Sequence, residues 1–132
     1  MNPKQFLLIG GVVLLLLGVL GYLLPDPLLG NALWLTGGEN ITHVVLGIVA
    51  IVAAYALGHM AQKWLTIIVG LVALYFGVAG FFLAQTAPPA LNYYNVANLE
   101  LLDNLIHLVV AIWAFMAAKG AKHDMMGSPS NA

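Results

Sequence analysis

Apolar residues dominate four long stretches of the chain, and polar or turn-forming residues separate these stretches. They run over residues 5–24, 40–58, 64–84 and 99–118. Each is close to the length of about 20 residues that a helix needs to cross a hydrocarbon core about 30 Å thick. None has the alternating pattern, about ten residues long, that is typical of membrane β-strands. The pattern therefore predicts four transmembrane helices, followed by a polar tail over residues 119–132.

The composition also indicates an integral membrane protein. Of the 132 residues, 62% are hydrophobic and 7% are charged, and the mean hydropathy is +0.97. Soluble domains are about 45–50% apolar and about 25% charged, so a soluble enzyme is disfavoured. The only basic residues are four lysines and the net charge is −1, which leaves no basic surface for nucleic acid. The absence of cysteine excludes disulfides, thiolate metal sites and catalytic thiols.

The positions of the lysines predict the orientation of the helices. Lys4 precedes the first stretch, Lys63 lies between the second and third, and Lys119 and Lys122 follow the fourth. All four therefore fall on one side of the membrane, and cytoplasmic segments carry an excess of lysine and arginine. We expect an all-α integral membrane protein, a bundle of four transmembrane helices with both termini in the cytoplasm.

Two pairs of similar segments indicate an internal repeat. Gly18–Leu24 resembles Gly77–Leu83, which lies 59 residues later, and Glu39–Val45 resembles Asp103–Val109, which lies 64 residues later. Shared Leu and Val residues mean little between apolar helices, but matching Asn and His residues are rare within membrane spans. We therefore expect a duplicated helical hairpin. Because each unit has two spans, the copies share one orientation and are related by a pseudo-two-fold axis along the membrane normal.

One face of the second helix and the matching face of the fourth carry the candidate functional groups. A rotation of about 100° per residue brings acid, amide and imidazole groups together above a stripe of small residues. Pseudo-symmetry then predicts that His43 and His107 approach each other about one helical turn below the outer surface. The candidate residues are Glu39, Asn40 and His43 on the second helix and Glu100, Asp103, Asn104 and His107 on the fourth.

Four roles for this cluster remain open. Carboxylates and imidazoles suit zinc or another divalent transition metal, and two histidines on different helices suit the axial positions of haem b. A proton-responsive pair is the third role, because His titrates near neutral pH. In the fourth role, the acids and amides cap helix starts and the imidazoles hydrogen-bond across helices. A metal site would use Glu39, His43, Asp103 and His107, a haem site would use His43 and His107, and Asn40, Asn104 and Glu100 would be supporting polar groups.

No spacing in the chain indicates a catalytic site. We therefore expect a small non-enzymatic membrane protein of unknown activity, surrounded by the lipid bilayer. It would act as a homo-oligomer or as an accessory subunit of a larger membrane complex. The alternative is a metal-binding, haem-binding or proton-responsive protein that uses the paired histidines. An oligomeric channel or transporter is less favoured, because the spans carry no charge at mid-membrane.

Three motifs resemble those of a known family. The first helix ends G-V-L-G-Y, the second opens E-N-x-x-H-x-x-x-G and the fourth opens D-N-x-x-H. In these features the chain, from about Phe6 to Ala118, resembles the small bacterial four-helix membrane proteins grouped as domain of unknown function 4383. Ala111 stands in the fourth helix where Gly47 stands in the second, which departs from a symmetric pattern. The resemblance implies four spans and a bacterial inner membrane, and it implies no activity.

Overall fold

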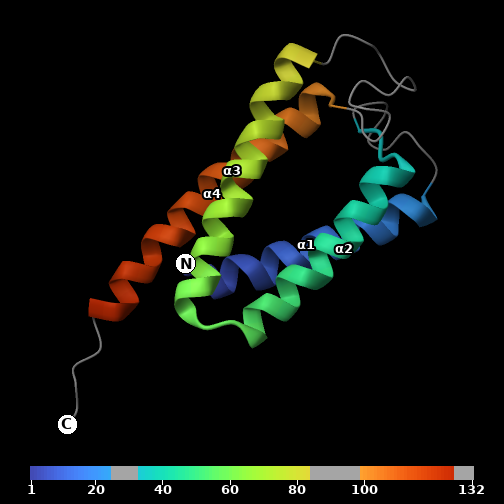
Figure 1. The fold of residues 1–132 in the computed structure, drawn as a ribbon. Coiled ribbons are helices and arrows are strands. Elements are labelled where there is room, and N and C mark those ends of the chain that lie inside the picture. The colour runs from blue at the N-terminus through green and yellow to red at the C-terminus, as the bar shows by residue number, and fades with distance from the viewer. Residues whose placement is uncertain (25–32, 84–98, 127–132) are drawn as a thin grey trace.

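The computed structural model describes residues 1–24, 33–83 and 99–126, and the described part contains four α-helices and no β-strand (Figure 1). All four helices are long and apolar enough to cross a membrane. The prediction of a helical fold with four helices able to cross a membrane is therefore confirmed for the described residues. Residues 127–132 of the predicted polar tail lie outside the described part. The helices are α1 (Pro3–Leu23), α2 (Gly37–Ala56), α3 (His59–Leu83) and α4 (Leu101–Met126).

Local sequence explains where the first two helices begin. The Asn2 side chain accepts a hydrogen bond from the backbone N–H of Gln5, and the Gln5 side chain accepts one from the backbone N–H of Asn2. Pro3 follows at the first helical position, where a missing N–H costs nothing. Thr36 and Glu39 form the same reciprocal capping box at the start of α2. Both helices thus start where a side chain satisfies their free amides.

The last two helices extend beyond the predicted spans. α3 begins at His59, ahead of the apolar stretch, and α4 continues past Ala118 to Met126. Lys63 and Lys119 therefore lie within helices. An apolar stretch marks only the part of a helix that hydrocarbon surrounds, whereas the backbone hydrogen bonds continue into polar sequence.

Small residues line the contacts between the helices of this bundle, and many large apolar residues face outward, although Phe6 and Leu7 are buried. Between helices surrounded by lipid there is no hydrophobic driving force, so close backbone approach through small residues stabilises the contact. Most described residues of the predicted stripes lie at these contacts, whereas Gly58, at the end of the α2 stripe, is exposed, and Ala84 lies outside the described residues. Buried small residues include Gly11, Gly18, Gly47, Ala54, Ala73, Gly77, Ala111 and Ala114, and exposed large residues include Val13, Leu16, Val49, Val52, Leu71, Val109 and Ile112.

The helices pack as two hairpins, α1 with α2 and α3 with α4 (Figure 1). A β-carbon at Gly47 would lie 2.7 Å from the backbone oxygen of Gly11, so glycine is needed where α1 crosses α2. In the second hairpin, a β-carbon at Gly70 would lie 2.9 Å from the Phe115 ring. The α1–α2 crossing therefore brings backbone against backbone, whereas the α3–α4 contact at Gly70 is made by a side chain.

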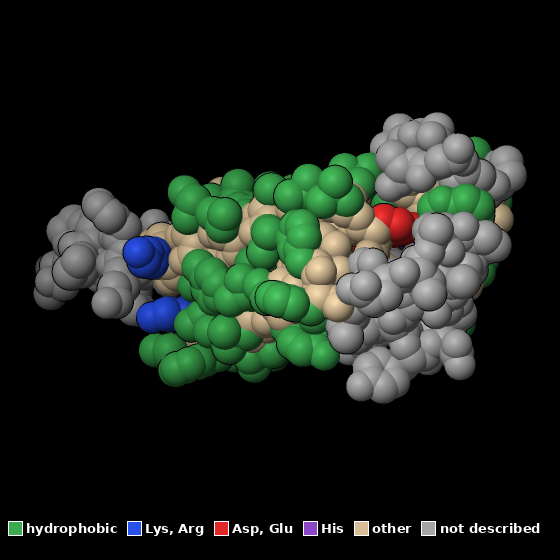
Figure 2. Space-filling model, turned by 90° about the horizontal axis from the view of Figure 1, so that it is seen from above, with side chains coloured by type: hydrophobic (Ala, Val, Ile, Leu, Met, Phe, Trp, Pro, Cys, Tyr) green, Lys and Arg blue, Asp and Glu red, His purple; other side chains and the backbone are tan. Residues whose placement is uncertain are grey.

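The two hairpins meet at one end of the molecule and diverge towards the other (Figure 1). Phe6 on α1, Ala54 on α2 and Ala114 on α4 belong to one buried apolar cluster. We call this end the lysine end, because Lys4 and Lys63 lie there at the starts of α1 and α3. The opposite end is called the acidic end, because Glu39 lies there in the first turn of α2 and Asp103 in the first turn of α4. Figure 2 shows lysine side chains at one end and acidic side chains towards the other.

Candidate functional site

Glu39 caps the N-terminus of α2 together with Thr36. The backbone N–H of Thr36 donates to Oε2 of Glu39 over 2.7 Å, and the backbone N–H of Glu39 donates to the Thr36 hydroxyl over 3.2 Å. Negative charge at this position also complements the positive end of the helix dipole. Glu39, a predicted metal ligand, therefore has one carboxylate oxygen engaged in the cap.

The two asparagines lie between the helices of their own hairpins. Asn40 and Asn104 are each 2% exposed. The Oδ1 atom of Asn40 occupies the space where a β-carbon of Gly21 would lie, and Oδ1 of Asn104 occupies the matching space at Gly80. Neither oxygen has a conventional hydrogen-bond partner among the described residues. Each amide therefore fills the space that the absent β-carbon of its partner glycine leaves open, which lets the two helices of the hairpin approach closely there.

On α4, His107 is paired with the acid one turn before it. Its Nδ1 atom lies 2.9 Å from the backbone oxygen of Asp103 and 3.3 Å from Oδ2 of the same residue. Two acceptors face this nitrogen, so Nδ1 carries a proton. The ring lies 5.5 Å, centroid to centroid, from that of Phe76 on α3. This places a polarised imidazole beside α3 and next to a 7% exposed carboxylate.

His43 on α2 has a different environment from that of its counterpart. Its Nδ1 atom is buried and has no hydrogen-bond partner among the described residues. The predicted approach of His43 to His107 remains a prediction.

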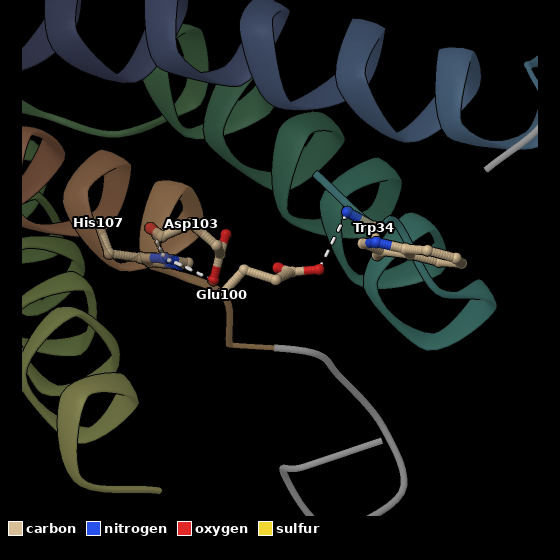
Figure 3. A network of polar contacts seen from close by, with 4 residues as sticks. All are labelled: Trp34, Glu100, Asp103 and His107. Carbon is tan, nitrogen blue, oxygen red and sulfur yellow. Dashed lines mark hydrogen bonds and ion pairs between the residues drawn. The ribbon is translucent and has the colours of Figure 1, made fainter. Parts of the chain in front are cut away.

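Glu100 links the two hairpins directly. Its Oε1 atom accepts a hydrogen bond of 3.0 Å from the backbone N–H of Trp34, which precedes α2 (Figure 3). Figure 3 shows Glu100 between Trp34 on one side and Asp103 with His107 on the other. The predicted supporting group is thus the residue that bridges the acidic end.

A metal centre finds no support in this geometry. Among the side chains described in residues 1–24, 33–83 and 99–120, no three His, Asp or Glu residues gather closely enough to hold a metal ion. A metal site of Glu39, His43, Asp103 and His107 therefore remains a prediction from residue type alone. The haem site of His43 and His107 also remains a prediction.

Two buried polar residues at the lysine end were not predicted. Gln62 on α3 is 3% exposed, and its Nε2 atom donates to the backbone oxygens of Ala54, over 3.0 Å, and Leu57, over 2.9 Å. These are carbonyls at the end of α2 that lack helical partners. Thr66, four residues later on the same face, is fully buried. The sequence does contain a signal for this site. Gln62 and Thr66 are polar residues four positions apart at the start of an apolar helix, so they share one helix face.

No protein-family profile, curated protein or solved structure matches this chain. The resemblance to domain of unknown function 4383 therefore stays a prediction. Any function has to be argued from the residues and their packing.

Proposed function

We propose that this chain is a small non-enzymatic multi-pass membrane protein that acts as a homo-oligomer or as an accessory subunit of a larger membrane complex. The observation that carries the proposal is the division of side chains between inside and outside. Polar groups cap helices or join them, as Glu39, Gln62 and Glu100 do. The outward faces are apolar on all four helices. Such faces suit lipid and the spans of other membrane proteins.

We propose the bacterial inner membrane as its location, with the lysine end in the cytoplasm. The support is the positive-inside bias of the lysines together with the family resemblance. Because all four lysines fall on the same side of four spans, we propose that both termini lie in the cytoplasm.

We also propose that the hairpins arose by duplication and are related by a pseudo-two-fold axis. The support is that equivalent residues make equivalent contacts. Gly21 faces Asn40 in the first hairpin, and Gly80 faces Asn104 in the second. A chance similarity of apolar sequences would not be expected to pair the same two residue types at matching positions.

The assembly proposal is tested by the mass of the particle in native lipid. The untagged protein is extracted with its surrounding lipid by a polymer, and native mass spectrometry measures the protein content of each particle. We expect more than one chain per particle, or a second protein in fixed ratio. Charged substitutions at outward positions, Val49→Glu on α2 and Ile112→Glu on α4, map the contact face. A particle holding a single chain and no other protein overturns the proposal.

A proton-responsive protein is the second candidate. The specific observation in its favour is the pairing of His107 with Asp103, whose Nδ1 and Oδ2 atoms lie 3.3 Å apart. A visible spectrum and elemental analysis of the same untagged preparation test the metal and haem alternatives. A Soret band or stoichiometric metal that disappears in His43→Ala/His107→Ala would replace this candidate with a cofactor site.

A further inference from the structure

Side-chain contacts join the four helix ends at the lysine end. The start of α1 packs against α4, because Nε1 of Trp113 donates to the Met1 sulfur over 2.6 Å and a β-carbon at Gly120 would overlap the backbone oxygen of Met1. The start of α3 packs against the end of α2, where Nε2 of Gln62 donates to the backbone oxygen of Leu57 over 2.9 Å. These contacts hold the helix ends next to one another.

Three of these helix ends carry a lysine. Lys4 lies in the first turn of α1, and its ammonium group lies 5.3 Å from the centroid of the Tyr55 ring in the last turn of α2. Lys63 directly follows the glutamine of the α2–α3 contact, and Lys119 directly precedes the glycine of the α1–α4 contact. The contacts between helix ends therefore gather these four side chains, Lys4, Tyr55, Lys63 and Lys119, into what we call the lysine layer.

The positive charge of the lysine layer is not balanced by described acids. Among the side chains that the structure describes, the acids are Glu39, Glu100 and Asp103, and all three belong to the acidic end. No ion pair between described side chains joins a lysine to a carboxylate, and the pair of His107 with Asp103 lies at the other end of the bundle. Towards the lysine end, the sequence carries four lysines and a single acid, Asp124. An anion from outside the chain would complement this surface.

A stripe of exposed apolar side chains runs along α3 away from Lys63. Trp64, Ile68 and Leu71 follow one another at spacings of four and three residues, so they share one face of the helix. They are 58%, 53% and 54% exposed, respectively. At a rise of 1.5 Å per residue, Leu71 lies about 12 Å from Lys63 along the axis, within the roughly 15 Å of hydrocarbon that one leaflet contributes. A hollow of about 430 Å³ continues along this face, lined by Leu71, Leu74, Tyr75, Val78 and Ala79.

We propose that the lysine layer binds the headgroup of an anionic phospholipid, and that an acyl chain of this lipid lies on the α3 stripe of Trp64, Ile68 and Leu71. Phosphate oxygens accept charge-assisted hydrogen bonds from ammonium groups, and the Tyr55 hydroxyl is a further donor. Lysines near a membrane surface attract anionic lipids, and an amphipathic ring such as that of Trp64 is typical of headgroup depth. The binding depends neither on which side of the membrane the lysine end faces nor on the number of chains in a particle.

Quenching of tryptophan fluorescence by brominated lipids tests this proposal, because Trp64 is exposed and lies next to Lys63. The full chain is reconstituted in phosphatidylcholine vesicles that contain either brominated phosphatidylglycerol or brominated phosphatidylcholine at equal mole fractions. The difference between the unmodified protein and Trp64→Phe gives the signal of Trp64. We expect the anionic lipid to quench this signal with an apparent affinity about fivefold higher, which corresponds to about 1 kcal/mol, the effect of one lysine at an anionic surface. Trp34 near the acidic end, isolated in the same way with Trp34→Phe, should show no such preference.

Matched variants assign the preference to the lysine layer. Lys4→Gln/Lys63→Gln/Lys119→Gln is expected to bring the affinity ratio in the Trp64 signal close to one. The corresponding triple arginine variant keeps the three charges and is expected to keep the preference. His59→Gln, an exposed polar position at the same end, is expected to keep it as well.

Three results would overturn the proposal. The first is an affinity ratio close to one for Trp64 in the unmodified chain, and the second is a ratio that the triple glutamine variant leaves unchanged. The third is an equal ratio for Trp34, because the whole protein would then attract anionic lipid. The comparison of the two tryptophans decides the matter even if the triple glutamine variant does not fold. None of these outcomes depends on particle mass, which tests the assembly proposal separately.

Discussion

At the scale of single residues, Gly80 and Asn104 depend on each other. A β-carbon at Gly80 would overlap Oδ1 of Asn104. Gly80→Ala is therefore expected to destabilise the fold by about 1–3 kcal/mol, the usual cost of overpacking. Thermal unfolding in detergent measures this cost, with Gly37→Ala as the control because its β-carbon meets nothing within 4 Å. Gly80→Ala/Asn104→Ala should be less unstable than the sum of its single variants, and strict additivity would contradict the contact.

Gln62 and Thr66 are neighbours on α3, but replacing each with an apolar residue is expected to change the stability of the protein in opposite ways. Gln62→Met leaves the carbonyls of Ala54 and Leu57 without their donor and should cost about 1–3 kcal/mol. The Thr66 hydroxyl is fully buried and has no partner among the described residues, so Thr66→Val should be neutral or stabilising. Unfolding in a graded detergent series measures both variants. A destabilised Thr66→Val protein would show that the hydroxyl has a partner, such as a bound water.

At the scale of helices, the two hairpins differ where Gly47 corresponds to Ala111. Alanine favours a helix by about 1 kcal/mol over glycine. At Gly47, however, its β-carbon would lie 2.7 Å from backbone atoms of Gly11 and Leu15, which retreat only if α1 and α2 separate. Gly47→Ala should therefore lower stability, by about 1–3 kcal/mol. Ala111→Gly, in which no atom is added, should cost only about 1 kcal/mol. If the two variants lost equal stability in the same unfolding assay, α1 and α2 would be no closer at Gly47 than α3 and α4 are at Ala111.

The helices themselves could be predicted because hydropathy and length alone define a membrane span. The contact faces could also be predicted, since small residues recur at helical spacing in α2 and α4. The partner of each polar group could not, because it depends on three-dimensional packing. Asn40 and Asn104 have the residue type of supporting ligands, but each lies against a glycine of its own hairpin. Nothing in the sequence distinguishes Glu100 from the other acids, but its side chain accepts a hydrogen bond from the backbone N–H of Trp34 in the other hairpin.

At the scale of the whole molecule, the separation of lysines from acids predicts how the bundle sits in the membrane. Gly37 and Gly58 are suitable reporters, because they are exposed, lie at opposite ends of α2 and have open space around a β-carbon. If the lysine end is cytoplasmic, a membrane-impermeant maleimide should label Gly37→Cys in intact spheroplasts and Gly58→Cys only after lysis. Full labelling of both variants after lysis is the control. The opposite pattern would place the acidic end in the cytoplasm and contradict the orientation predicted from the lysines.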